Sequence, residues 1–310
     1  MYFVEGTIGN VAAIALLTRP QIRSCFFNQL LAVLATFDIL YIITMMIESL
    51  KTLRPDIVET YFYTKTFPIL LYPLNHISMT GSIFTTVGVT LERFIATYKP
   101  IYYNQVIKNV TGHTKRFIQY TLTITILSVL FNIPKFLESE VVEDNSGFLY
   151  IDYTELRTNP LYNSIYHCWS RLFVLGILPF SVVSILNVMI YLAIKKLRRR
   201  HQKEEERLCI ILITIVVLFF VCNLPRLILN IHETYNLDQI TLCSFTPLGK
   251  ERFHEELMRS LCLGGRPIWI ILLGNISHVL LVLNSSANFY IYCVIGANLR
   301  HQLKMAICCK

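Results

Sequence analysis

The sequence predicts an all-α membrane protein, a seven-transmembrane helix bundle that forms a single domain over residues 1–310. Hydrophobic residues make up 54% of the chain and charged residues only 15%, whereas a soluble domain carries about 25% charged residues. The mean hydropathy is +0.51. Apolar runs long enough to cross a bilayer, roughly 20 residues, recur along the chain. Together these observations favour helices that face lipid.

Seven apolar runs give the expected spans. In chain order they cover residues 3–18, 28–48, 67–91, 117–137, 169–194, 208–231 and 267–295. The first run is the weakest, because it is short, begins almost at Met1 and contains Glu5. Nothing ahead of it has the basic start and small-residue cleavage site of a signal peptide. We therefore expect that part of the natural N-terminal segment is missing from this sequence.

The later runs have features that suit a bundle able to change shape. The third to sixth runs each contain a proline, which removes a backbone hydrogen bond and kinks a helix; these are Pro73, Pro134, Pro179 and Pro225. Beyond the seventh run, residues 297–307 place Leu299, Leu303 and Ile307 on one helical face. That spacing predicts a short amphipathic helix lying on the membrane.

The distribution of charge sets the expected orientation. If the first loop, 19–25, is cytoplasmic, most Lys and Arg residues fall on that side, with the densest block at 195–203. Most acidic residues fall on the opposite side. This is the positive-inside pattern, which predicts an extracellular N-terminus and a cytoplasmic C-terminus. The net charge of +8 therefore reflects topology and membrane lipid, and we expect no nucleic-acid partner.

Polar residues inside the expected spans are candidates for function, because such residues are rare in membrane helices. They have two interpretations: a network that holds helices together, or an ion site or switch. The expected set is Asn10, Asp38, Ser82, Asn284 and Ser285.

Several of these positions recur in a family pattern. Asn10, Asp38, the triplet Glu92-Arg93-Phe94, Pro179, FFVCNLP at 219–225 and NFYIY at 288–292 together resemble a rhodopsin-like (class A) G protein-coupled receptor. The match covers essentially the whole chain. The stretches FNIPKFLE and LRTNPLYNSIYHCW resemble the FMRFamide-type neuropeptide receptors of invertebrates.

The resemblance implies a cytoplasmic switch. In the family the arginine of the triplet, here Arg93, is held by the neighbouring acid, Glu92, and by an acid at the base of the sixth helix. That acid would be Glu204, Glu205 or Glu206, and Glu205 matches best, since it lies 20 residues before Pro225, about 30 Å along a helix. The resemblance also implies a sodium ion near Asp38 and no other cofactor or metal. The remaining switch positions are Phe219, Asn223, Pro225, Asn288 and Tyr292.

Some positions depart from the family pattern. Asn223 stands where the family usually has tryptophan, and Phe289 stands where the last helix usually has proline. The cysteine expected at the outer end of the third helix is Pro68, so the family's usual outer disulfide is expected to be absent.

The outer surface favours an extracellular cationic ligand, in particular an amidated peptide of the FMRFamide type. Acidic residues at outer helix ends, including Glu138, could pair with a guanidinium, and we favour Glu48 and Glu233 as the counter-ions. The same acids could instead only steer the approach of a cation. The other expected contacts are Asn75, His76, Met79, Arg226, Asn230 and His278.

Cysteines and histidines suggest modification sites but no metal site. Cys243 and Cys262 share the third outer loop, and that oxidising face permits a disulfide. Cys308 and Cys309 follow the last span and are candidates for palmitoylation, although unmodified thiols fit equally. No His/Cys cluster has metal-binding spacing.

The leading hypothesis is therefore a plasma-membrane receptor, not an enzyme, that passes a neuropeptide signal to a cytoplasmic heterotrimeric G protein. Receptors for another peptide or for a lipid remain alternatives. A transporter would use buried Asp38 and Asn284 as an ion path, but the inverted repeats typical of transporters are not visible. A membrane enzyme would need a partner acid, base or metal set beside Asp38.

Overall fold

The computed structural model describes residues 2–19, 26–53, 61–108, 110–144, 147, 149–196, 202–235 and 268–295. Nearly all of them are helical. In chain order the elements are α1 (Tyr2–Leu17), α3 (Phe26–Leu53), α4 (Tyr61–Thr66), η2 (Phe67–Leu71), α5 (Tyr72–Tyr98), α6 (Pro100–Lys108), α7 (Val110–Asn132), η3 (Ile133–Leu137), β1 (Ser139–Glu143), β2 (Leu149–Tyr153), α8 (Glu155–Thr158), α9 (Pro160–Tyr162), η4 (Asn163–Ser170), η5 (Leu172–Ile177), α10 (Leu178–Lys196), α11 (Gln202–Tyr235) and α14 (Ile268–Ile295).

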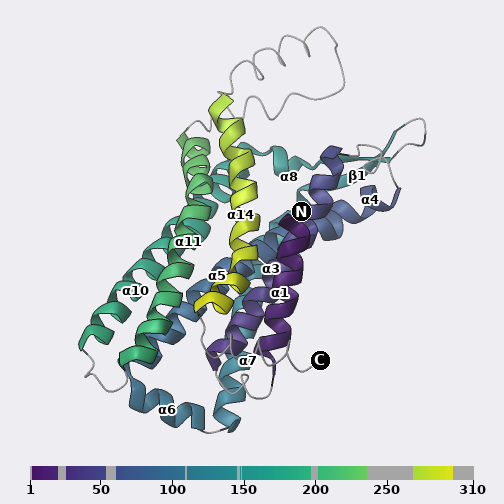
Figure 1. The fold of residues 1–310 in the computed structure, drawn as a ribbon. Helices are drawn as coiled ribbons and strands as arrows, with labels where there is room; N and C mark the ends of the chain where they lie inside the picture. The colour runs from purple at the N-terminus through teal and green to yellow at the C-terminus, as the bar shows by residue number, and fades with distance from the viewer. Residues whose placement is uncertain are drawn as a thin grey trace.

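The long helices form one bundle with α5 at its centre (Figure 1). Helix α5 packs against α3, α7 and α10, while α1 and α11 both contact α14. Short helix α6 lies at one end of the bundle and strands β1 and β2 lie at the other. We call these the α6 end and the hairpin end.

Membrane-spanning character is visible in several helices of the described part of the chain. Three helical stretches are long and apolar enough to cross a bilayer: Phe26–Leu50, Thr114–Leu137 and Pro160–Lys195. Shorter apolar helices lie at Val4–Leu17, Val217–His232 and Leu272–Ala287. Helix α5 is less apolar because small and hydroxyl residues such as Ser78, Gly81 and Thr85 fill its buried faces. The amphipathic helix expected over 297–307 lies outside the described residues.

The fifth expected span, 169–194, begins earlier in the structure. The helix starts at Pro160, after Asn159, whose side chain accepts hydrogen bonds from the backbone nitrogens of Leu161 and Tyr162. Asparagine at the N-cap followed by proline is a favourable helix start. Polar residues in the first turns, such as Asn163 and His167, keep this stretch out of the apolar run.

The prolines coincide with irregular helix geometry. Wide π-helical turns, η2 and η5, come shortly before Pro73 and Pro179. Pro134 lies in η3, the 3₁₀ segment that ends α7, and Pro225 lies inside α11. A proline supplies no N–H to the preceding turn and its ring crowds the carbonyl there, so the backbone widens, tightens or bends at these points.

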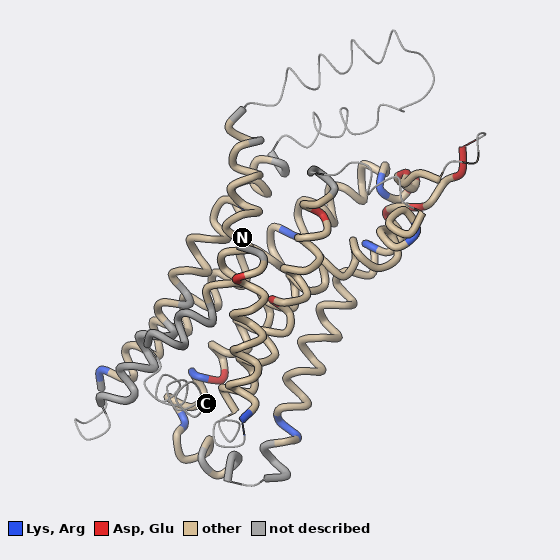
Figure 2. Tube along the Cα trace, turned by 45° about the vertical axis from the view of Figure 1, so that its right-hand side comes forward, with Lys and Arg blue, Asp and Glu red and all other residues tan. Residues whose placement is uncertain are grey.

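Strands β1 and β2 form an antiparallel hairpin that nothing in the sequence pattern indicated. Its register pairs Ser139 with Tyr153 and Glu140 with Asp152. Acidic residues gather in and beside this hairpin (Figure 2). The apolar alternation of the two strands is weak because neither face is deeply buried, so a period of two is hard to see in the sequence.

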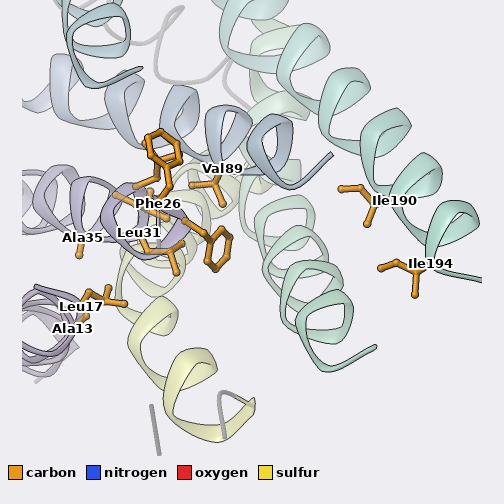
Figure 3. Packing of buried hydrophobic residues seen from close by; sticks show 11 residues of the cluster. Ala13, Leu17, Phe26, Leu31, Ala35, Val89, Ile190 and Ile194 are labelled. Carbon is orange, nitrogen blue, oxygen red and sulfur yellow. The ribbon is translucent and has the colours of Figure 1, made fainter. Parts of the chain in front are cut away.

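Two hydrophobic clusters fill the bundle. The first lies toward the α6 end and includes Phe26, Leu31, Val89 and Ile190 (Figure 3). The second lies toward the hairpin end; its buried members are Tyr41, Met79, Ile83, Leu175, Phe180, Phe219, Leu281 and Val282. Along α3 the buried polar residue Asp38 falls between Ala35 of the first cluster and Tyr41 of the second. The apolar packing is therefore interrupted by a polar layer.

A close approach of α3 and α5 depends on Gly81. A Cβ atom built there would overlap the ring of Phe37 on α3, which is buried. Small residues let membrane helices pack backbone to backbone. We expect Gly81→Ala to lower the midpoint of thermal unfolding in detergent, because overpacking costs about 1–3 kcal/mol.

Gly274→Ala is the matched control, since nothing lies within 4 Å of the corresponding Cβ position. A helix interior is more stable with alanine than with glycine by about 0.5–1 kcal/mol, so this variant should unfold at the same or a higher temperature. Equal midpoints for the two variants would show that α3 and α5 do not need glycine at position 81.

Candidate functional site

Three polar sites lie at different depths in the bundle. The middle one is the layer between the hydrophobic clusters. Ser82 donates a hydrogen bond of 2.7 Å to Asp38 Oδ1, which joins α5 to α3. Asn10 Nδ2 donates to the backbone oxygens of Gly6 and Ser285, at 2.9 and 2.8 Å, which joins α1 to α14. Asn284 is half-buried. The structure thus brings four of the five predicted residues into interhelical contacts, and sodium binding there remains a prediction.

The α6 end carries the predicted switch residues Glu92 and Arg93. Glu92 is fully buried, and its Oε2 accepts a 2.8 Å hydrogen bond from Arg116 on α7. The guanidinium of Arg93 lies 3.5 Å from the centre of the Phe27 ring, a cation–π contact. The Tyr120 hydroxyl interacts electrostatically with both Glu92 and Arg116.

Arg116 is a functional candidate that sequence reasoning missed. The family pattern assigns Glu92 to its neighbour Arg93, whereas the described contact of the Glu92 carboxylate is with a residue 24 positions later. Adjacent residues on a helix point in different directions, so Glu92 faces α7 while Arg93 faces Phe27 on α3. The predicted third member, Glu205, lies in α11, but its side chain is outside the described part.

On α11 the predicted switch residues Phe219 and Asn223 are buried. Phe219 is buried against Phe180, with ring centres 5.3 Å apart. Asn223 is buried too, and its Nδ2 donates a 2.8 Å hydrogen bond to the backbone oxygen of Phe219, one turn earlier in the helix. The side chains of Asn288 and Tyr292 on α14 lie outside the described part.

The described residues among the predicted ligand contacts lie toward the hairpin end of the bundle. Arg226 Nη1 is 2.7 Å from the sulfur of Met79. Asn75 donates to the Thr44 hydroxyl at 3.0 Å, and His76 packs edge-on against Tyr72 with ring centres 4.8 Å apart. The Arg226–Met79 contact joins α11 to α5, and the Asn75–Thr44 contact joins α5 to α3. The other predicted contacts are Glu48, half-exposed on α3, Asn230, buried on α11, and His278, exposed on α14.

Other predictions also lie outside what the structure describes. The side chain of Glu233 is one. The others concern the pairing of Cys243 with Cys262 and the modification of Cys308 and Cys309.

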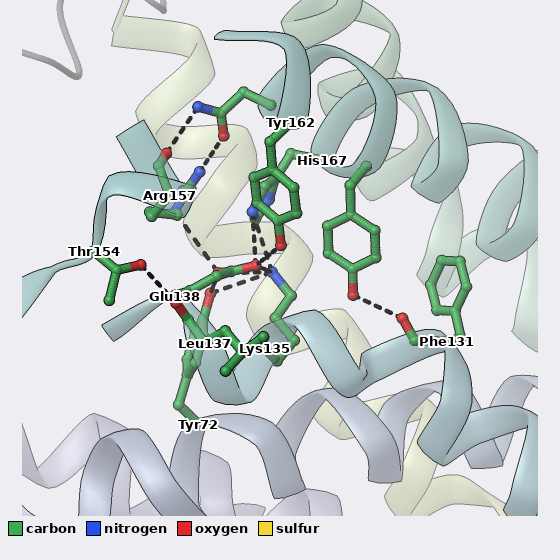
Figure 4. Close-up of polar contacts among 11 residues, drawn as sticks. Tyr72, Phe131, Lys135, Leu137, Glu138, Thr154, Arg157, Tyr162 and His167 are labelled. Carbon is green, nitrogen blue, oxygen red and sulfur yellow. Dashed lines mark hydrogen bonds and ion pairs between the residues drawn. The ribbon is translucent and has the colours of Figure 1, made fainter. Parts of the chain in front are cut away.

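The hairpin end contains a buried ionic cluster around Glu138 (Figure 4). We call it the Glu138 cluster; its members are Tyr72, Lys135, Glu138, Arg157, Tyr162 and His167. Lys135 Nζ lies 2.9 Å from Glu138 Oε1, and both side chains are almost fully buried. Glu138 is thus not available as a counter-ion for a ligand, which corrects the expectation for this one acidic residue.

The remaining members saturate the carboxylate. Tyr72 donates to Oε2 at 2.7 Å, Tyr162 donates to Oε1 at 2.6 Å, and His167 Nε2 lies 3.0 Å from Oε1. Burial opposes ionisation of Glu138, but the contact with His167 and the charge of Lys135 outweigh it and hold the pKa of Glu138 well below its usual range. An ionised carboxylate only accepts hydrogen bonds, so we infer that His167 Nε2 carries the proton.

Comparison with known proteins gives the family of this chain. A family model described as "7 transmembrane receptor (rhodopsin family)" matches residues 9–292. The chain therefore belongs to the rhodopsin family of G protein-coupled receptors. This confirms the predicted fold class, a seven-helix membrane bundle, and the prediction that the protein is a receptor and not an enzyme.

Similarity to individual proteins is more specific than the family match. The chain is 28% identical over 309 residues to the FMRFamide receptor of Drosophila melanogaster, an alignment that covers 94% of this chain and 50% of that protein. It is 30% identical over 321 residues to the FMRFamide peptide receptor frpr-18 of Caenorhabditis elegans, covering 98% of this chain and 67% of the relative. The chain thus spans half the length of the Drosophila relative. The predicted resemblance to invertebrate FMRFamide-type receptors is confirmed.

The Glu92–Arg116 pair should behave as a coupled unit. Arg116→Met leaves a fully buried carboxylate without this partner, and breaking a buried pair costs about 3–5 kcal/mol. We expect Arg116→Met to lower the thermal midpoint more than Glu92→Gln does. The double variant should lose much less than the sum of the two single decreases in thermal midpoint. Lys115→Met, at an exposed position on the same helix, is the control. Additive losses would contradict the coupling.

The pH dependence of stability should report the Glu138 cluster. Because the pKa of Glu138 is depressed in the folded state, its ionisation stabilises the protein above the unfolded pKa, about 4.3, and this contribution is lost as pH falls below that value. The difference in thermal midpoint between the wild type and Glu138→Gln should therefore be larger at about pH 5 than at about pH 3.5. A difference that does not shrink over this acidic range would contradict this assignment.

Proposed function

We propose that the protein is a plasma-membrane receptor for an extracellular neuropeptide, an amidated peptide of the FMRFamide type, and that it signals to a cytoplasmic heterotrimeric G protein. The observation that carries the proposal is the similarity to two FMRFamide receptors along nearly the whole chain. In this proposal the hairpin end is extracellular and the α6 end is cytoplasmic. The positive-inside distribution of Lys and Arg supports that orientation.

The contacts in the outer half suit a ligand that is partly apolar. Met79, His76 and Arg226 lie on neighbouring faces of α5 and α11, where an aromatic side chain and a neutral amide could lie beside them. The carbonyl oxygen of such an amide would accept from the Arg226 guanidinium, a charge-assisted hydrogen bond. Glu48, at the outer end of α3, remains the proposed counter-ion for a cationic ligand residue, together with Glu233.

Signal transfer would depend on the α6 end. Arg93 is the proposed latch, and Glu92, held by Arg116, fixes the adjacent turn of α5. Agonist binding shifts a two-state equilibrium only as far as the ligand prefers one state. We propose that the active state frees Arg93 from Phe27 and opens a cleft for the G protein beside α6.

The test is calcium and cyclic-AMP signalling in cells that express the chain, challenged with a panel of amidated peptides. We expect a nanomolar-range response to a peptide ending in Arg-Phe-amide, and its loss in Arg93→Ala because the guanidinium that the active state would present to the G protein is gone. Arg19→Ala, which changes an exposed arginine at the end of α1, should respond like the wild type.

Surface expression is measured with an N-terminal epitope tag on intact cells, which also tests the proposed orientation. Silence of the well-expressed wild type across the whole panel would overturn the ligand assignment. A response to an unrelated peptide or a lipid alone would replace the ligand and keep the receptor. A full response in Arg93→Ala would overturn the latch.

A further inference from the structure

Both ends of the β1–β2 hairpin meet at Glu138. Glu138 directly precedes β1, and Thr154 directly follows β2. The backbone nitrogen of Thr154 donates to the backbone oxygen of Glu138 at 3.2 Å, and the Thr154 hydroxyl donates to the backbone oxygen of Leu137. The hairpin is therefore closed at its base, and the base is the residue that carries the buried carboxylate.

The Glu138 side chain connects this base to separate parts of the bundle. Its oxygens accept from Tyr72, at the start of α5, and from Tyr162, in the helix that leads into α10. Lys135, on η3 at the end of α7, completes the set. One carboxylate thus joins the hairpin, and the η3 segment directly before it, to two helical segments that are distant in the sequence (Figure 4).

These contacts are little screened because the ion pair at the centre of the cluster is buried. The side chains of Glu138 and Lys135 are 0% and 1% exposed, and charged hydrogen bonds are little screened away from water. Arg157, whose side chain is 32% exposed, adds a longer contact of 3.7 Å from the solvent side. It is itself held by Asn163, whose Nδ2 donates to the Arg157 backbone oxygen at 2.9 Å.

A covalent link does not share this task. Residues 26–167 contain no cysteine, so neither the hairpin nor α5 or α7 can be tied by a disulfide. An extracellular loop without a disulfide needs another constraint to hold one orientation, because each ordered backbone residue costs about 1–2 kcal/mol in conformational entropy.

We propose that Glu138 is a positioning residue: it acts as a non-covalent clasp that fixes the β1–β2 hairpin against the outer end of the bundle. The clasp does not depend on the identity of the ligand. It sets the position of the acidic loop past which any ligand from that side must enter.

The test is hydrogen–deuterium exchange, read by mass spectrometry, on the purified full chain in lipid nanodiscs without ligand. In Glu138→Gln the amides of 139–153 should exchange about tenfold faster or more, since local opening becomes easier when a charge-assisted bond is lost. Residues 26–35, in the hydrophobic cluster at the α6 end, should exchange as in the wild type. Glu140→Gln is the matched control, because Glu140 lies on the same hairpin and is exposed.

The outcomes separate a clasp from a general structural role. Unchanged exchange over 139–153, or an equal increase over 26–35, would overturn the proposal. A reducing agent should leave the exchange of the wild-type hairpin unchanged, and acceleration comparable with that of Glu138→Gln would show that a disulfide elsewhere does the work. Failure of the signalling test would bear on the proposed ligand alone, because the exchange experiment uses no ligand.

Discussion

A charge or hydrogen-bonding group that leaves water must find its partner inside the bundle, and this constraint organises the structure. An isolated buried ion is far more costly than a paired one. Glu92 meets Arg116, Asp38 meets Ser82, and Glu138 meets Lys135. The first two contacts join different helices, and Tyr72 and Tyr162 join Glu138 to two more, so the polar groups fix which helices are neighbours at each depth. The apolar clusters between them supply cohesion, but apolar packing alone would tolerate rotation of a helix more easily.

Helix α5 shows how a polar helix can occupy the centre. Its buried hydroxyls donate back to carbonyl oxygens one turn earlier, as Thr85 does to Gly81 and Thr90 does to Thr86. These bonds satisfy the hydroxyls without a partner helix, and the small side chains leave room for close neighbours. The same helix carries Tyr72 at the hairpin end, Ser82 in the polar layer and Glu92 at the α6 end. A shift of α5 therefore changes contacts at all three depths, which is the physical connection a receptor needs between a ligand outside and a partner inside.

The family pattern accounts for the residues of the polar layer and of the α6 end better than for those of the hairpin end. Asn10, Asp38, Glu92 and Arg93 occupy positions that match the rhodopsin-family pattern. At the hairpin end the chain departs from it: the position of an expected cysteine is Pro68, and the ionic Glu138 cluster lies where the hairpin joins the bundle. A charged clasp is reversible and has several partners, so the loop it holds responds to substitution of any one of them.

The sequence by itself indicated a bundle of membrane helices, the polar residues that would be buried, and the family, because apolar run length and the order of motifs can be read along the chain. It placed Asp38, Ser82 and Asn10 in the interior and Pro225 within a helix. Only the tertiary structure decided the pairings. Arg116 reaches Glu92 across 24 residues, and Tyr72 reaches Glu138 across 66, because the rotation and packing of whole helices choose which side chains meet. The hairpin was not predicted for the same reason. Its short, half-exposed strands are closed at their base by the contacts of Glu138 and Thr154, and these contacts leave no periodic pattern in the strand sequences.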